Sequence, residues 1–505
     1  MDEVVAGNER ILAVLHALVT RNEPTGVREL AQVLGASRST VSRVLLGLVE
    51  HGLATATPQG TYEVGPRMRV LGAALHARHP LTRAAGGIIE HLAEDSDSTV
   101  LAAVHDAPRP QVAVIVSRRR PGPVTYHLDP GTIVPLHAGA TGRSILGRVG
   151  LQALGDEPLD PRTPDTVTDR AEIERLLAVD RRAGYTISVG QQFPLAAGAA
   201  ASFQCMGLTG SVSITRPRFL TSDEDLERFG PMARQAAMNL EVACQLLPTP
   251  SDGEPITYPA GSTALARIIR IMTALCSHPT GIGCGPNLAR RIGANIATTN
   301  RLISSLLATG VALERQGFLL PGPRLLQWAA LLGPALDIPT TARHIVQNLA
   351  QETGETIGLA QLNQDTLEAE MTMVVNGVKP LHYGLASGVQ IPLHAGAAGK
   401  AILAHCPPAK LDTLTLHSFT ENTQTDRSIL AAELETIRTR GWATGTGERL
   451  PDAFGVSAPY FVCDAIAGSI TATVARMRLS ELDIEELAQK VKQAAQQLTQ
   501  LLTVA

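Results

Sequence analysis

The chain has 505 residues, of which 44% are hydrophobic and 18% are charged, and its formal net charge is −4. This composition is typical of a globular protein with several domains and excludes a chain that is disordered throughout. No uninterrupted apolar run of about 18 residues occurs, and no basic N-terminal segment precedes an apolar one, so we expect a cytoplasmic protein without a membrane partner.

The first 65 residues combine helical periodicity with strand signals. Apolar residues recur at helical spacing in two short segments, the second of which stops at Gly35. Ser37 can cap a third helix that stops at Gly52, and a turn then separates two short strands. Helices are therefore predicted over 9–20, 27–34 and 38–50, and strands over 53–57 and 61–64. This order predicts a winged helix-turn-helix domain over residues 1–65.

The outward face of the third helix combines short hydroxyl side chains with arginines. Hydroxyls suit phosphate contacts and a forked guanidinium suits a guanine edge, so this face predicts binding to double-stranded DNA. The candidate DNA-binding residues of this domain are Arg28, Ser37, Arg38, Ser39, Thr40, Ser42, Arg43 and Thr61. A protein-interaction domain is the alternative, because residues 1–65 hold five Arg against seven Asp or Glu.

A linker helix is predicted over residues 66–80, where Pro80 ends it. Beyond it, helices are predicted over 81–94, 138–148, 169–182 and 223–247, and strands over 98–104, 111–117, 133–136, 185–189, 199–205 and 209–215. Antiparallel strands with helices on their faces predict an α+β sensor-type domain over residues 81–247.

The chain then repeats itself. Residues 135–143, PLHAGATGR, return 257 positions later as residues 392–400, PLHAGAAGK. A repeat of this length is too long for a solenoid unit, so it predicts a tandem duplication of a whole multidomain unit around a pseudo-twofold axis. The predicted second copy follows a linker over 248–262 and comprises a winged helix-turn-helix over 263–322, a linker helix over 323–337 and an α+β domain over 338–505.

The third helix of the second copy has changed in sequence. Asn295-Ile296-Ala297 replaces Ser37-Arg38-Ser39, with Asn295 as a possible cap. Residues 262–320 nevertheless hold six Arg against one Glu, an excess that suits phosphate contacts with relaxed base reading. The candidate DNA-binding residues of this half are Arg290, Arg291, Asn295, Thr298, Thr299 and Arg301.

The repeated PLHAG stretch lies at a predicted strand-to-helix junction. The amides of Gly139, Ala140 and Thr141, and those of Gly396, Ala397 and Ala398, are free to point at an anion such as a carboxylate. The glycine spacing is wrong for a P-loop, which excludes nucleotide binding. The alternative is that the glycines only allow close helix–strand packing, while His137 and His394 hydrogen-bond the turn.

The six cysteines form no CxxC motif or Cys/His cluster, and their positions do not match between the copies. We therefore expect reduced thiols and no metal site. No GxSxG motif or paired acid constellation is present, so we expect neither an enzyme nor a cofactor.

Each copy resembles the IclR family of bacterial transcription regulators, named for the isocitrate lyase regulator. The residues that carry the resemblance are 9–12, 30–31, 37–48, 60–65, 135–146, Gly184-Tyr185, Gly441-Trp442 and 455–459. The family implies a winged helix, a linker helix and a GAF-like domain that binds a small organic or aromatic acid as effector. It also implies dimers paired through the DNA-binding domains, which predicts a homodimer of this chain as the equivalent of the family's tetramer.

Carried over from the family, the effector-binding residues are Ala140, Thr141, Ser213 and Thr215 in the first copy and Ala397, Ala398, Glu448, Thr471 and Thr473 in the second. Gln191 stands in the first copy where an acidic group is expected. The resemblance implies a ligand-responsive regulator, a repressor of a catabolic operon. An interaction scaffold with one decayed DNA-binding copy, or a hydrolase of a small acid derivative, is the alternative.

Overall fold

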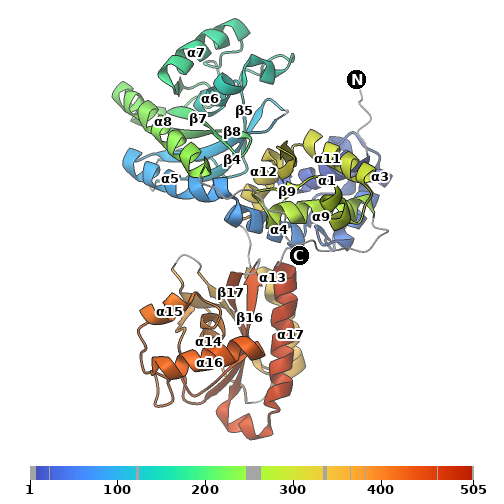
Figure 1. Cartoon of the computed structure of the whole chain (residues 1–505), viewed down its shortest axis with the longest axis vertical. Coiled ribbons are helices and arrows are strands. Elements are labelled where there is room, and N and C mark those ends of the chain that lie inside the picture. The colour runs from blue at the N-terminus through green and yellow to red at the C-terminus, as the bar shows by residue number, and fades with distance from the viewer. Residues whose placement is uncertain are drawn as a thin grey trace. The chain divides into compact units, whose positions relative to one another are not determined.

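The computed structural model describes residues 7–21, 23–107, 109–120, 124–245, 263–333, 338–363, 366–379, 381–462 and 465–502. It divides into two compact units, residues 1–336 and 337–505, and each unit is described by itself (Figure 1). The predicted linker over 248–262 lies outside the described residues.

The first unit begins with the three helices and the ribbon that the sequence predicts. These elements are α1 (Gly7–Arg21), α2 (Val27–Val33), α3 (Arg38–Glu50), β1 (Ala54–Ala56) and β2 (Tyr62–Val64). Leu15, Leu30 and Leu45 come from the three helices and are buried together in one small core. The Ser37 hydroxyl accepts a hydrogen bond from the Thr40 amide at 3.2 Å, which caps α3 as expected.

The linker helix α4 (Pro66–Arg78) leads directly into α5 (Pro80–Ser96). Pro80 cannot continue the hydrogen bonding of α4, so the chain changes direction at His79 and starts a new helix. The prediction of a helix that ends at this proline is confirmed.

The first α+β domain contains a six-stranded antiparallel sheet in the order β5-β4-β3-β8-β7-β6. Its strands are β3 (Thr99–His105), β4 (Gln111–Arg118), β5 (Ile133–Pro135), β6 (Thr186–Val189), β7 (Ala196–Cys205) and β8 (Leu208–Pro217). Helices α5 and α8 (Asp223–Gln245) cover one face, and α6 (Gly139–Val149) and α7 (Arg170–Ala183) lie on the other (Figure 1). Because both faces are covered, the central strand β3 is buried along almost its whole length.

The first unit continues with a second set of short elements in a similar order. They are α9 (Ala264–Ser277), β9 (Ile282–Gly283), α10 (Pro286–Ile292), α11 (Ile296–Ala308), β10 (Ala312–Arg315), β11 (Phe318–Pro321) and the linker helix α12 (Pro323–Leu332). The three strands form a sheet in the order β10-β11-β9, one strand more than the ribbon of the first copy.

The two linker helices α4 and α12 pack against each other. Gly72 allows this close approach, since a Cβ on it would lie 2.9 Å from the Leu332 Cβ and 3.6 Å from the Ala329 Cα. Ala329 is the residue that the repeat offset of 257 pairs with Gly72. A residue that meets its own repeat equivalent lies near a twofold axis, so the two linker helices pair around such an axis within the first unit.

The second unit repeats the topology of the first sheet, in the order β14-β13-β12-β17-β16-β15. Its strands are β12 (Thr356–Leu362), β13 (Ala369–Val375), β14 (Val389–Ile391), β15 (Ala443–Thr446), β16 (Ala453–Val462) and β17 (Ala465–Ala475). Helices α13 (Ile338–Thr353) and α17 (Ile484–Leu502) cover one face, and α14 (Ala397–Leu403) and α16 (Arg427–Arg440) cover the other (Figure 1). The short α15 (Pro408–Thr413) lies between α14 and α16 in the chain order.

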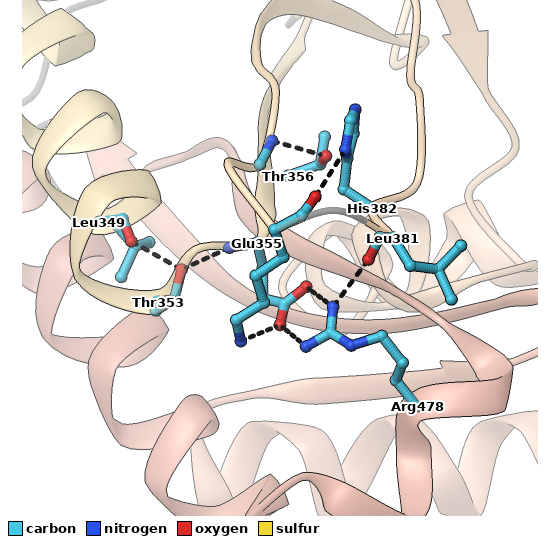
Figure 2. A network of polar contacts seen from close by, with 9 residues as sticks. Leu349, Thr353, Glu355, Thr356, Leu381, His382 and Arg478 are labelled. Atoms are coloured by element: carbon cyan, nitrogen blue, oxygen red, sulfur yellow. Dashed lines mark hydrogen bonds and ion pairs between the residues drawn. The ribbon is translucent and has the colours of Figure 1, made fainter.

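A buried acid fastens the second sheet to the loop that precedes β14. Glu355 is almost fully buried, and its carboxylate pairs with Lys379 at 2.7 Å and with Arg478 at 2.8 Å (Figure 2). Arg478 also donates to the Leu381 carbonyl at 3.0 Å (Figure 2). These ion pairs hold the start of the loop in place. Further along, the same loop carries Leu385, which lines a cavity of this domain.

One cysteine pair contradicts the expectation of reduced thiols. Cys205 on β7 and Cys244 on α8 form a disulfide with their Cα atoms 5.6 Å apart. The two residues are 39 positions apart, and only the packing of α8 on β7 brings them together. Cys284 and Cys406 form no disulfide within the described residues, and Cys463 lies outside them.

Candidate functional site

The exposed face of α3 carries the arginines that the sequence singled out. Arg38, Ser39 and Arg43 are exposed, and neither arginine has a hydrogen-bond or ion-pair partner within the described residues. Ser37 lies at the start of this face, where its hydroxyl contacts those of Ser39 at 3.0 Å and Thr40 at 2.8 Å. Two unpaired guanidiniums thus stand on a helix whose first turn is held by hydroxyl contacts.

The other candidates of the first domain surround α3. Arg28 is exposed on α2, and Ser42 is half-buried on α3. The Thr61 hydroxyl is 2.7 Å from that of Thr57, so it helps to close the turn between β1 and β2. Within this domain, the Thr61 side chain therefore stabilises the turn of the two-stranded ribbon.

The second copy presents α11 (Ile296–Ala308) in the place of α3. The Asn295 side chain accepts from the Thr298 amide at 2.8 Å and caps the helix as expected. Thr299, a candidate for DNA contact, is fully buried and donates to the Asn295 carbonyl at 2.9 Å. That assignment was wrong, because the helical period places Thr299 on the inward face with Leu302 and Leu306.

The arginines of the second copy differ in their surroundings. Arg301 is exposed and lies 3.5 Å from the Thr298 hydroxyl on the same helix. Arg290 is exposed and donates to Asn287 within α10. Arg291 instead contacts the His278 ring at 3.1 Å, directly after α9. Arg290 and Arg301 therefore remain the more accessible cations.

A cavity of about 70 Å³ lies in the second unit at the start of α14. It is lined by all five effector-binding candidates of this copy, namely Ala397, Ala398, Glu448, Thr471 and Thr473. Arg449 and several apolar side chains, among them Met371, Leu385 and Ile391, complete the lining. A mostly apolar cavity with a few polar groups is typical of a small-molecule site.

Glu448 takes one of the amides expected to face a ligand. Its carboxylate accepts from the Gly396 amide at 2.8 Å and from the buried Lys400 at 2.6 Å. Lys400 also pairs with Glu433 at 2.6 Å, so one buried cation bridges two carboxylates. The expectation of a free Gly396 amide was wrong, because an acid from the loop after β15 already satisfies it. The amides of Ala397 and Ala398 keep no hydrogen-bond partner in the described part of the chain.

The hydroxyls on β17 divide between structure and cavity. The Thr471 hydroxyl is 2.7 Å from that of Ser457, its neighbour on β16. Thr473 lines the cavity, is 6% exposed, and its hydroxyl has no partner among the residues described. Thr473 is therefore the hydroxyl that is available to a ligand.

A smaller cavity of about 30 Å³ occupies the same place in the first α+β domain. Ala140, Thr141 and Thr215 line it as expected, whereas Ser213 does not. Ser213 is completely buried behind Thr141 and accepts from the Thr141 hydroxyl at 3.1 Å. Its assignment to the cavity was wrong, because α6 lies so close to β8 that these hydroxyls bond each other.

Aromatic side chains and amides complete this first cavity. Tyr126 and Phe193 meet edge to face with ring centroids 5.8 Å apart. Burial raises the pKa of Tyr126. Gln191 also lines the cavity and accepts from Arg143 at 2.9 Å, as Glu448 accepts from Lys400. Gln191 thus fills the structural position of Glu448.

The repeated histidines lie beside the junctions and serve the turns. The His137 ring is 3.0 Å from the Asp160 carbonyl, and the His394 ring is 2.9 Å from the His417 carbonyl. Burial lowers the pKa of His137, which favours its neutral form. Both rings hold a following loop in place, as the packing alternative predicts.

Sequence reasoning missed Arg449, the buried cations Arg143 and Lys400, and the aromatic residue Tyr126. The repeat itself offered a signal for the cations, since Arg143 and Lys400 hold equivalent positions in the PLHAG stretch. Over the described ranges, no group of three or more metal-ligating side chains is arranged around a common point. No helix in those ranges combines the length and apolar character needed to cross a membrane.

Comparison with known proteins identifies the class. The family model for the C-terminal domain of the bacterial transcriptional regulator IclR matches residues 73–242 and 334–500, and the IclR helix-turn-helix model matches residues 9–58. The chain belongs to the IclR family of bacterial transcriptional regulators. It carries the C-terminal domain of that family twice, which confirms the duplication of this domain, and it is a regulator of transcription.

Each of the relatives named below covers less than half of this chain. The HTH-type transcriptional regulator BhcR of Paracoccus denitrificans is 29% identical over 224 residues, 42% of this chain and 78% of the relative. The HTH-type transcriptional regulator TtgV of Pseudomonas putida is 30% identical over 203 residues, 39% of this chain and 76% of the relative. An IclR homologue from Microbacterium hydrocarbonoxydans, solved in complex with 4-hydroxybenzoate, is 22% identical with a TM-score of 0.41 and covers 48% of this chain and 99% of its own. The named relatives are regulators, not enzymes.

Proposed function

We propose that one chain acts as the family's dimer does, as a repressor that binds an asymmetric operator with both halves and responds to small effectors. The observation that carries this proposal is the packing of α4 on α12, where Gly72 meets its repeat equivalent Ala329. That contact holds the two N-terminal domains as a fixed pair without a second chain. The domain boundaries are proposed at 65, 80, 247, 262, 322 and 337.

The first domain supplies base reading in this proposal. Arg38 and Arg43 are exposed and unpaired within the described residues, so they are free to approach guanine edges. Ser37 to Ser42 supply hydroxyls at the start of the same helix.

The second domain is proposed as a second winged helix-turn-helix that grips phosphate. Arg301 holds the position of Arg43, but Ile296 and Ala297 replace Arg38 and Ser39. Residues 262–320 keep six Arg against one Glu, which supports attraction to the DNA backbone with less base reading.

The first α+β domain contacts α12 of the second copy, which offers a route for the response. Gln327 on α12 donates to the Gly131 carbonyl at 3.1 Å, and a Cβ on Gly131 would lie 2.2 Å from the Leu331 Cγ. Gly131 ends the loop that carries Tyr126 and Leu128 into the first cavity. A ligand that moves this loop would bias the packing of α12 and so the spacing of the two DNA-binding domains.

The larger assembly rests on the family resemblance. Two chains are proposed to associate through their effector domains into a homodimer. Light scattering tests this part, and a monomer at micromolar concentration would contradict it without affecting the rest of the proposal.

The function is tested with purified full-length chain and the DNA upstream of its own gene. We expect retardation in native gels that a small effector relieves, and loss of most specific affinity in the Arg38→Ala/Arg43→Ala variant. Arg175→Ala is the matched control, because Arg175 is an exposed arginine on α7, away from α3. If specific binding survived the double substitution, the assignment of α3 as the helix that reads the bases would be wrong. Failure to bind DNA would favour the scaffold, and turnover of the effector would favour the hydrolase.

A further inference from the structure

The two cavities differ in ionisable side chains at one pair of adjacent positions. The loop after β6 carries Gln191-Gln192, and the equivalent loop after β15 carries Glu448-Arg449 at the repeat offset of 257. All four residues line their cavities. The first cavity therefore holds two neutral amides where the second holds an acid and a base.

The acid of the second cavity already has hydrogen-bond and ion-pair partners. Glu448 accepts from Lys400 and from the Gly396 amide, and Lys400 is shared with Glu433. The two carboxylates and Lys400 together carry a net charge of −1, but both carboxylates are paired with Lys400, and Arg449 forms no ion pair with this group. A ligand carboxylate would therefore meet Arg449 without facing an unpaired acid.

Arg449 is the available counter-charge. Its guanidinium donates to the Gln390 carbonyl at 3.1 Å, and within the described residues it forms no ion pair with an acid. Burial lowers the pKa of this group, a sign that solvent only partly stabilises its charge. A ligand carboxylate would replace that lost solvation with a charge-assisted hydrogen bond.

A further donor lines the same cavity as Arg449. A Cβ on Gly396 would lie 3.8 Å from the Arg449 Cβ, so the arginine starts next to the first turn of α14. The Thr473 hydroxyl is unpartnered in the described residues, and its side chain is more than nine-tenths buried at the cavity wall. The cation and this hydroxyl together form a donor set for one carboxylate.

The first cavity offers no counter-charge. None of its lining residues is Asp, Glu, Lys, Arg or His. Gln192 stands in the place of Arg449, and its Oε1 lies 2.7 Å from the point that a Cβ on Gly139 would occupy. An anion buried there would lose its hydration without gaining a cation, which is costly. Neutral groups that hydrogen-bond to amides and hydroxyls suit this cavity better.

We infer that the two cavities of one chain select ligands of different charge: the second takes a small monocarboxylate through Arg449, and the first takes a neutral polar molecule such as a carboxamide. This inference rests on the proposed function in that both cavities are effector sites. The chain would then combine two chemical signals at one operator.

Calorimetric titration of the full chain with two matched probe pairs tests this inference. The pairs are propionate with propionamide and benzoate with benzamide, whose members share shape and differ in charge. We expect the wild type to bind one carboxylate per chain and one amide per chain without mutual competition. Arg449→Gln should weaken carboxylate binding by about 10- to 100-fold, whereas Arg449→Lys should retain most of it. Gln192→Arg should raise the carboxylate stoichiometry towards two.

Arg427→Gln is the matched control, because Arg427 lies in the same domain, donates to carbonyls and does not line this cavity. Thermal melts show whether each variant stays folded. Competition between acid and amide for one site, an unchanged carboxylate affinity in Arg449→Gln, or no binding of any of the four probes would overturn the inference. A wild type that binds these probes but not operator DNA would instead overturn the proposed function alone.

Discussion

The two effector domains share one topology and hold their polar groups differently. In the first, Arg143 pairs with Asp180 at 2.8 Å and with the neutral Gln191, and the loop over the cavity rests on α12. In the second, Lys400 bridges two acids, and Glu355 anchors the corresponding loop within its own domain (Figure 2). Duplication thus kept the backbone and let the charges diverge. Under the proposals made above, the first copy passes a signal to a neighbouring helix, and the second holds a charged ligand.

The largest expected effect comes from removing the buried cation. Lys400→Met leaves Glu433 and Glu448 without their shared partner, which should destabilise the second effector domain by about 3–5 kcal/mol. Arg143→Met should cost less, because only one carboxylate loses its partner there. Hydrogen exchange of α14 and α6 in urea measures the two domains separately. If the two substitutions lowered the stability of their domains equally, the number of acids paired with each cation would not explain the difference between the domains.

A fall in pH should weaken the contact between α1 of the first copy and α12 of the second, because His16 of the first copy titrates. Trp328 on α12 donates to the His16 ring at 3.0 Å, and burial lowers the pKa of His16 from 6.5 to about 4. A lowered folded-state pKa means that this stability is present above about pH 6.5 and is lost as the pH falls towards 4. At about 1.4 kcal/mol per pKa unit, a few kcal/mol depend on this proton.

The second copy has no equivalent titration, since Thr273 and Leu71 hold the positions that correspond to His16 and Trp328. His16→Asn keeps an acceptor for Trp328 and does not titrate. Its unfolding free energy should therefore vary less between pH 6.5 and 4 than that of the wild type. If the unfolding free energies of the two proteins changed with pH in the same way, the contact between His16 and Trp328 would not be linked to a proton.

If α3 and α11 both bind DNA as proposed, substitutions on them should separate base reading from contact with the DNA backbone. Arg43→Ala should cost about 1–3 kcal/mol on the operator and little on unrelated DNA, if its guanidinium reads a guanine. Arg301→Ala should weaken both DNAs alike and reduce the salt slope by about 1. Fluorescence anisotropy at several salt concentrations resolves the two patterns. If both substitutions lowered specificity equally, the proposed division of labour would be wrong.

Local patterns in the sequence predicted what local physics decides. Ser37 and Asn295 cap their helices as expected, because an N-cap needs only its own first turn. The junction at Ala397 and Ala398 was predictable because the duplicated motif fixes where a strand becomes a helix. The repeat offset therefore located most of the second cavity.

Local sequence patterns could not predict contacts between residues that are far apart in the chain. Glu448 reaches the Gly396 amide from 52 positions away, and Gln327 reaches Gly131 from 196 positions away. The Cys205–Cys244 pair likewise depends on how α8 packs on β7. Periodicity identifies the buried face of an element but not the partner that covers it. The hydrogen bond to the Gly396 amide and the disulfide were therefore visible only in the tertiary structure.

The smallest expected effect tests the inward placement of Thr299. Thr299 holds the position of the buried Val41 in the first copy, and its hydroxyl bonds only to the carbonyl of Asn295 in the same helix. Thr299→Val should therefore leave DNA affinity and its salt dependence unchanged and shift stability by no more than about 1 kcal/mol in either direction. Thr298→Val is the matched control, because Thr298 is half-buried on the same turn and its hydroxyl lies 3.5 Å from Arg301. A loss of DNA affinity in Thr299→Val that exceeds the loss in Thr298→Val would return Thr299 to the DNA-binding surface.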